Sequence, residues 1–166
     1  MIRIGHGFDV HALVKQRKLI LAGVEIAHHH GLLGHSDADV VIHALGDALL
    51  GAVALGDLGS HFPATEHCPV NSRLLLQHIR HLIAQRGYQL HNADVTVIAQ
   101  EPTLASYITQ MQTNLAADLM TTRDTISVKA TTTDYLGTIG RKEGIAAHAV
   151  VTVVTLDKAR SAYDRD

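Results

Sequence analysis

The chain has 166 residues, the size of one ordinary domain, and 46% of them are apolar, which is enough for a packed core. Lys and Arg number 14 against 16 for Asp and Glu, so the sequence shows no basic surface for nucleic acid or membrane. Its apolar stretches end well before the roughly 18 residues that cross a bilayer. The single cysteine excludes an intramolecular disulfide.

Alternation between apolar positions and polar or glycine positions predicts a half-buried strand over residues 2–11. Successive side chains of a strand point to opposite faces. Asp9 and His11 are therefore expected on one face, and Phe8 and Val10 on the other.

A helix is predicted to begin after Ser36, whose hydroxyl suits the N-cap position and which Asp39 follows three residues later. Apolar residues recur at helical spacing as far as Ala52. Asp39, His43 and Asp47 are four residues apart, so they share one face of this helix. The two aspartates either orient the ring of His43 or form a solvated, charged face near the helix dipole.

The remaining segments continue this mixture of strands and helices. We expect a strand over 18–26 with a bulge or turn at Gly23, an exposed loop over 28–31, a loop over 55–71, a helix over 71–86, a strand over 94–100, a helix over 104–119, and strands over 127–132 and 145–156. This order predicts an α+β fold, layered as in α/β proteins, with a mixed β-sheet and helices packed on one face. Residues 1–158 are expected to form a single domain and residues 159–166 a frayed tail.

A carboxylate and two imidazoles from two different elements are enough for a three-ligand metal site. Asp9 and His11 on the strand and His43 on the helix can converge if the helix packs over the strand. Zinc accepts both ligand types, and three protein ligands leave its fourth position open, as in catalytic zinc sites. The alternative is a surface hydrogen bond between Asp9 and His11.

Two further segments suit phosphate binding. His35 and Ser36 precede the predicted helix, whose N-terminal N–H groups attract phosphate, although Ser36 alone can also serve as a cap. Residues 129–134, KATTTD, place hydroxyls and a carboxylate at a strand end, which suits phosphate and Mg²⁺, although a threonine-rich strand is also explained by β-propensity. The histidine run at 28–30 has no carboxylate beside it in sequence, so no metal site is expected there.

Six strings, in order over nearly the whole chain, together resemble one family. They are GHGFDVH (5–11), GLLGHSDADVVIHALGDALLGA (31–52), ALGDLG (54–59), DVTVIAQEP (94–102), VKATTT (128–133) and GRKEGIA (140–146). The chain resembles the 2-C-methyl-D-erythritol 2,4-cyclodiphosphate synthase family of the non-mevalonate isoprenoid pathway.

The resemblance implies a phosphorus–oxygen lyase that converts 4-diphosphocytidyl-2-C-methyl-D-erythritol 2-phosphate into the cyclic diphosphate and CMP. It implies a homotrimer whose sheets face a central axis and whose active sites lie at subunit interfaces. It also implies zinc or another divalent transition metal, Mg²⁺ or Mn²⁺, and a bacterial cytoplasmic or plastid stromal location without nucleic-acid or membrane partners. From the residues alone, a zinc-dependent phosphohydrolase and a non-enzymatic, histidine-rich zinc-binding protein remain alternatives.

By the same resemblance, zinc is held by Asp9, His11 and His43. His35 and Thr132 would stabilise the transition state. The residues expected to contact substrate are Asp9, His11, His35, Ser36, Asp57, Gly59, Phe62, Thr65, Ala99, Pro102, Thr103, Leu104, Ala105, Thr131, Thr132, Thr133, Asp134 and Arg141.

The chain departs from the family pattern at four positions. Asp134, at the expected Mg²⁺ position, replaces the usual glutamate and is one methylene shorter. Thr103 replaces a lysine near the nucleotide, and Ala64 replaces an aspartate. Thr138 replaces an aromatic residue of the axial cavity, which Arg141 is expected to line.

Overall fold

A computed structural model describes residues 1–63 and 71–156. The strands are β1 (Ile2–Lys15), β2 (Leu19–Leu21), β3 (Val24–Ile26), β4 (His30–Leu32), β5 (Tyr88–Ile98), β6 (Ile126–Thr131) and β7 (Gly144–Thr155). The helices are α1 (Val40–Ala52), α2 (Leu58–His61), α3 (Ser72–Gln85), α4 (Ile108–Leu119) and α5 (Gly137–Gly140), with 3₁₀ turns η1 (Ala105–Tyr107) and η2 (Arg123–Thr125).

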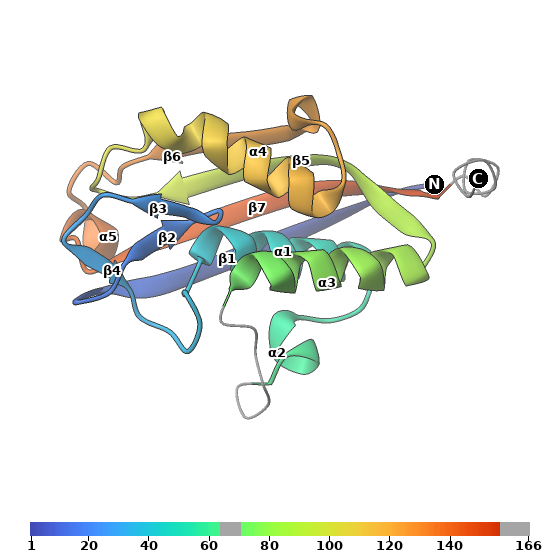
Figure 1. Cartoon of the computed structure of the whole chain (residues 1–166), viewed down its shortest axis with the longest axis horizontal. Coiled ribbons are helices and arrows are strands. Elements are labelled where there is room, and N and C mark those ends of the chain that lie inside the picture. Colours follow the sequence, from blue (N-terminus) through green and yellow to red (C-terminus); the bar gives the residue numbers. More distant parts are fainter. Residues whose placement is uncertain (64–70, 157–166) are drawn as a thin grey trace.

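Five strands form one mixed sheet in the order β4-β1-β7-β5-β6. Neighbours run antiparallel except β5 and β6, which are parallel and joined by the α4 crossover. Helices α1, α3 and α4 lie on one face of this sheet (Figure 1). The predicted α+β class, with a mixed sheet and helices on one face, is confirmed. None of the described helices is long and apolar enough to cross a bilayer.

Strand β1 packs against α1 through its glycine side. A Cβ added at Gly5 would lie 1.8 Å from the carbonyl oxygen of Ala48, and one added at Gly7 would lie 1.8 Å from that of Ala44. Any side chain at these two positions would push the helix away. The glycines therefore let α1 lie directly on β1, and they bring His43, next to Ala44, over the strand.

The apolar side of β1 is its exposed side. Ile2 is 63% exposed, Ile4 71%, Phe8 48% and Val10 48%, and Val150 of the neighbouring strand β7 is 44% exposed. The alternation predicted for this strand is confirmed, with the polar and glycine side turned to the helices. An apolar sheet face of this kind typically marks a protein–protein contact.

The segment predicted as one strand over 18–26 is instead the hairpin of β2 and β3. Its turn has positive φ at Ala22 (50°) and Gly23 (69°), which confirms the turn expected at Gly23. The carboxylate of Asp39 accepts hydrogen bonds from both turn N–H groups, at 2.9 and 2.7 Å. This contact with the start of α1 is long-range, so local periodicity could not reveal the turn's full geometry.

Two predicted loops contain short elements. Residues 28–31 include the start of β4, which pairs with the end of β1, and residues 55–71 include α2, capped by Asp57. Strand β5 begins at residue 88, earlier than predicted, because β7 pairs along its whole length. The elements predicted over 71–86, 104–119, 127–132 and 145–156 are confirmed to within a few residues as α3, η1 with α4, β6 and β7.

Candidate metal centre

Asp9, His11 and His43 meet at one point between β1 and α1. His11 Nε2 lies 2.8 Å from Asp9 Oδ2, His43 Nδ1 lies 3.1 Å from the same oxygen, and the two ring nitrogens are 3.1 Å apart. Ligands of a tetrahedral zinc lie about 3.3–3.6 Å from one another, because each is about 2.0–2.2 Å from the ion. A small outward movement of the three side chains therefore fits them around such an ion.

The electrostatics of this group suit a cation. Burial by itself would raise the pKa of Asp9, but hydrogen bonds from His11 and His43 outweigh it and hold the pKa well below its usual range. The hydrogen bond to Asp9 raises the pKa of His11, against the effect of burial. Asp9 is therefore ionised at neutral pH, and a bound metal has to compete with a proton on His11.

The other nitrogen of the His43 ring faces a second pair of residues. Ser72 Oγ lies 3.4 Å from His43 Nε2, and the carboxylate of Asp37 accepts hydrogen bonds from the Ser72 hydroxyl and from its backbone N–H. The Ser72 side chain is buried at the start of α3. Asp37 and Ser72 thus orient the His43 ring, a role that the sequence analysis did not assign to them.

Asp39 and Asp47 do not orient that ring, so this hypothesis for them is wrong. The buried carboxylate of Asp39 accepts hydrogen bonds from backbone N–H groups, including those of Val41 and Ile42, and is the N-cap of α1. Asp47 accepts the backbone N–H of Leu58 at 2.8 Å. Both carboxylates instead fix the ends of neighbouring segments.

The prediction of Ser36 as the N-cap is also wrong, because the N-cap is Asp39 and α1 begins at Val40. The Ser36 hydroxyl accepts the backbone N–H of Ala38 at 3.1 Å and shapes the turn before the helix. The guanidinium of Arg17 donates to the carbonyl oxygens of Gly34 and Ser36, and so holds the loop around His35. Arg17 lies in no recognisable motif, which is why sequence reasoning missed it.

A hollow of about 220 Å³ opens beside the three candidate ligands. It is lined by His11, Gly34, His35, Ser36, His43, Leu58, Gly59, Phe62 and Leu75. The predicted residues His35, Ser36, Gly59 and Phe62 are thus brought to the metal centre. Asp57 lies at the N-terminus of α2, where its carboxylate accepts from the Ser60 N–H.

A second hollow, of about 420 Å³, lies where the ends of β5 and β6 meet η1. It is lined by Ala99, Gln100, Pro102, Thr103, Leu104, Ala105, Ile108, Ala130, Thr131 and Thr132. Seven residues predicted to contact the substrate from two separate segments therefore share one surface. This hollow and the metal-side hollow have no lining residue in common.

Three further residues predicted to contact the substrate do not line the second hollow: Thr133, Asp134 and Arg141. The Thr132 hydroxyl donates to the carboxylate of Asp134 at 3.3 Å, and the Thr133 hydroxyl donates to the carbonyl oxygen of Leu136. Arg141 is exposed and pairs with Glu143 at 2.7 Å. The expected contact at Thr65 and the departure at Ala64 fall outside the described residues.

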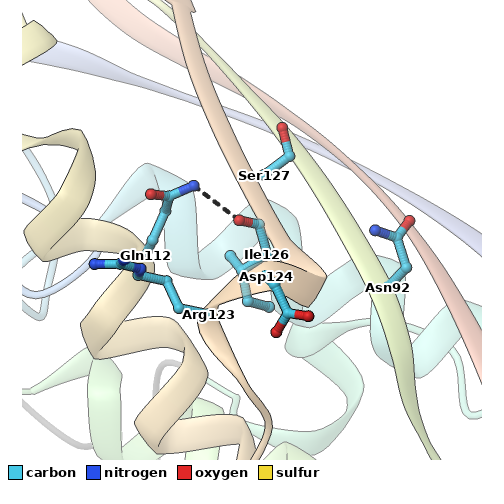
Figure 2. Close-up of a pocket in the computed structure, with 6 residues that line it drawn as sticks. All are labelled: Asn92, Gln112, Arg123, Asp124, Ile126 and Ser127. Atoms are coloured by element: carbon cyan, nitrogen blue, oxygen red, sulfur yellow. Dashed lines mark hydrogen bonds between the residues drawn. The ribbon is translucent and has the colours of Figure 1, made fainter.

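A larger hollow, of about 610 Å³, has no histidine in its lining. It lies beside β5, η2 and β6, lined by the six residues labelled in Figure 2. The amide of Gln112 donates to the Ile126 carbonyl at 2.9 Å, the dashed line in Figure 2. The amide of Asn92 donates to the Thr125 carbonyl at 3.2 Å. These amides support local backbone, so size alone does not identify a site.

Comparisons with known proteins agree with this geometry. The model of the YgbB family matches residues 2–154. A relative from Geobacter metallireducens, named 2-C-methyl-D-erythritol 2,4-cyclodiphosphate synthase, is 58% identical over 152 residues, which are 90% of this chain and 97% of the relative. A relative of the same name from Alkaliphilus oremlandii is 52% identical over 155 residues, 92% of this chain and 99% of its own.

Solved structures show the same fold. The bifunctional IspDF of Campylobacter jejuni superposes with a TM-score of 0.91 and 44% identity over 95% of this chain, which spans only 43% of that longer protein. IspF of Plasmodium falciparum, solved as a CDP complex, has a TM-score of 0.83 and 33% identity, with 94% of this chain and 97% of that chain covered. The chain therefore belongs to the YgbB family, whose curated relatives at this level of identity are named 2-C-methyl-D-erythritol 2,4-cyclodiphosphate synthase.

Proposed function

We propose that this chain converts 4-diphosphocytidyl-2-C-methyl-D-erythritol 2-phosphate into 2-C-methyl-D-erythritol 2,4-cyclodiphosphate and CMP. The observation that carries the proposal is the triangle of Asp9, His11 and His43 beside a hollow lined by His35 and Ser36. Relatives that are named for this activity match this chain over almost their full length.

The reaction needs no nucleophile from the protein. An oxygen of the substrate's 2-phosphate forms a bond to the β-phosphorus, and the bond between that phosphorus and the bridging oxygen breaks, so that CMP leaves with the bridging oxygen. Because both reacting groups belong to one molecule, the protein's main task is to fold that molecule into an in-line arrangement. A second task is to neutralise two phosphates that approach each other.

The donor set of Asp9, His11 and His43 suits Zn²⁺ or another borderline divalent ion, with one coordination position left for substrate. Such an ion, when bound, polarises a phosphate oxygen as a Lewis acid. The protein's own contribution is to hold these ligands: Ser72 and Asp37 fix the His43 ring, and β1 fixes the other two side chains.

We assign the rest of the substrate to the two hollows. His35 and Ser36 would hold a phosphate beside the metal centre, with His35 stabilising the charge that develops there. Asp57, Gly59 and Phe62 would contact the methylerythritol part. These residues lie on the loop before α1 and on α2, next to the metal ligands.

The cytidine diphosphate would lie in the second hollow, against residues 99–105 and 131–133. Thr132 would stabilise the transition state from this side. The carboxylate of Asp134 accepts a hydrogen bond from the Thr132 hydroxyl. It would hold a Mg²⁺ or Mn²⁺ ion that also contacts the diphosphate. The two hollows share no lining residue, and the resemblance implies active sites at subunit interfaces, so one substrate would be held between the metal-side hollow of one copy and the nucleotide-side hollow of another.

That arrangement requires an oligomer, and we propose a homotrimer with the apolar sheet faces turned to its axis. The uncovered side chains of Ile2, Ile4 and Phe8 support this, since association would bury them. Arg141 would line the axial cavity. Sedimentation velocity tests the assembly: Ile4→Lys is expected to lower the mass to that of one chain, whereas Leu74→Lys, at a side chain 55% exposed on α3, is not.

The product assay tests the function directly. Purified chain is mixed with the cytidine-diphospho substrate, Zn²⁺ and Mg²⁺, and followed by ³¹P NMR. CMP and a cyclic diphosphate in equal amounts are expected. Inorganic phosphate would instead indicate a zinc-dependent phosphohydrolase, and unchanged substrate with several bound zinc ions would indicate a zinc-buffering protein.

A further inference from the structure

Three histidines outside the proposed active site form a second group of potential metal ligands. The candidate ligand nitrogens of His28, His29 and His30 all lie within 4.8 Å of one another. The ring centroids of neighbouring pairs are 4.3 and 4.5 Å apart, and those of the outer pair 6.0 Å. His29 is exposed and the other two are half-buried, so an ion from solution reaches all three.

The backbone that carries these rings is held at both ends. The N–H of Ala27 donates to the Tyr107 hydroxyl at 3.4 Å, and His30 begins β4, where it pairs with Lys15 of β1. A Cβ at Gly31 would lie 2.2 Å from the carbonyl oxygen of Lys18, so β4 packs tightly against the preceding chain. Anchored in this way, the run loses less conformational entropy on binding an ion than a free polyhistidine tail would.

Glu101 interacts electrostatically with this run, while its own carboxylate is paired with a lysine. Glu101 pairs with Lys142 at 2.8 Å, and this pairing lowers its pKa, with further contributions from His28 and His29.

We propose that His28, His29 and His30 bind one divalent transition ion of the zinc class, at a site separate from Asp9, His11 and His43. Imidazole nitrogen suits Zn²⁺, Ni²⁺ and Cu²⁺, whereas Mg²⁺ and Ca²⁺ prefer oxygen. The rings must rotate inward, since ligands of a tetrahedral ion lie about 3.3 Å apart. Because no carboxylate is among its ligands, this site is weaker than the first, and water completes the coordination.

Equilibrium dialysis of the full chain against Zn²⁺ alone, followed by elemental analysis, tests the site without any use of activity. The wild-type chain binds two ions, and the combined variant His28→Gln, His29→Gln and His30→Gln loses one. His91→Gln, at an exposed histidine on β5, is the matched control and retains both. His43→Ala loses the other ion and keeps the one at residues 28–30, so failure at either centre is recognised separately.

The single variants at the three positions test whether all three rings ligate. Each is expected to weaken the second ion by about tenfold or more, because loss of an outer-shell partner alone already costs that much. A triple variant that still binds two ions overturns the proposal. Unchanged affinity in His29→Gln also overturns it, because the site would then be a two-histidine chelate. Thermal unfolding of the metal-free variants, followed by circular dichroism, confirms that their fold is unchanged.

Discussion

The metal-side hollow and the second hollow are held together in different ways. At the metal-side hollow, side chains converge: Asp9, His11 and His43 are 25%, 22% and 18% exposed, and Ser72 supports the last of them. The second hollow is lined mainly by small side chains and by the backbone path of residues 99–105. A site of converging side chains depends on the identity of each one, whereas a site shaped by backbone tolerates side-chain changes. The following substitutions test this contrast.

His43→Ala should have the largest effect, because it removes a ligand that no neighbour replaces. We expect loss of zinc from this centre and a fall in CMP formation of at least about 10³-fold, the factor that corresponds to several kcal/mol of metal stabilisation. Binding of CMP itself, measured by calorimetry, should change by less than about twofold, since distant sites act almost independently. Full activity in this variant would mean that the three residues are not the working centre.

Gly7→Ala should damage the metal side through the backbone. The added Cβ meets the carbonyl oxygen of Ala44 at 1.8 Å, so α1 must move away from β1, at a cost of about 1–3 kcal/mol in unfolding free energy. Gly51→Ala is the matched control. It lies on α1, the helix that Gly7 contacts, and its added Cβ meets nothing within 4 Å. That control should gain about 0.5–1 kcal/mol in urea unfolding. Equal stability of the two variants would contradict the close packing.

Ser72→Ala should loosen the His43 ring while keeping all three ligands. We expect zinc affinity to fall about 10- to 100-fold, the usual effect of removing an outer-shell partner. Competition with a chromogenic chelator measures it. If zinc affinity does not change, the ring is fixed by packing alone and the contact with Ser72 is incidental.

Asp39→Asn gives a test that depends on pH. The amide group cannot accept all the N–H groups that the carboxylate serves, so we expect a loss of about 1–3 kcal/mol in unfolding free energy. Burial raises the pKa of Asp39 to about 6, although its backbone hydrogen bonds oppose this. A raised native pKa contributes stability that is present below the ordinary value of 3.8 and is lost as pH rises through about 6.

The deficit of Asp39→Asn relative to wild type is therefore expected to be larger near pH 4.5 than near pH 7.5. Urea unfolding of the metal-free proteins at both values measures it. Groups that do not interact with Asp39 titrate alike in the two proteins, so the difference reports Asp39 together with the two groups it interacts with, Asp37 and His11. A deficit that grows with pH would show that its native pKa is not raised.

Thr103→Lys should have the smallest effect and should act only on the nucleotide side. It restores the positive charge that family members usually carry beside the nucleotide, and exposed ion pairs contribute about 0.2–1 kcal/mol, or up to about fivefold in affinity. CMP binding should tighten at low salt and lose that gain at high salt. Thr103→Gln, of similar length but uncharged, is the control, and zinc content should be the same in all three proteins.

The sequence by itself determined the features that follow from local periodicity. Alternation placed Asp9 and His11 on one face of β1, and helical spacing predicted α1 around His43. The six motifs identified the family, and two of them marked the segments that line the second hollow. Each element and each motif was recognised from residues that lie close together in the chain, and the family from the order of the motifs along it.

Only the tertiary structure decided which side of β1 meets the helices, because the carbonyl oxygens that exclude side chains at Gly5 and Gly7 belong to α1. It likewise brought Ser72 to His43. Such contacts join residues far apart in the chain, and they depend on how closely whole elements pack. Local patterns carry no information about that distance, so the candidate ligands were predicted from the sequence but the residues that support them were not.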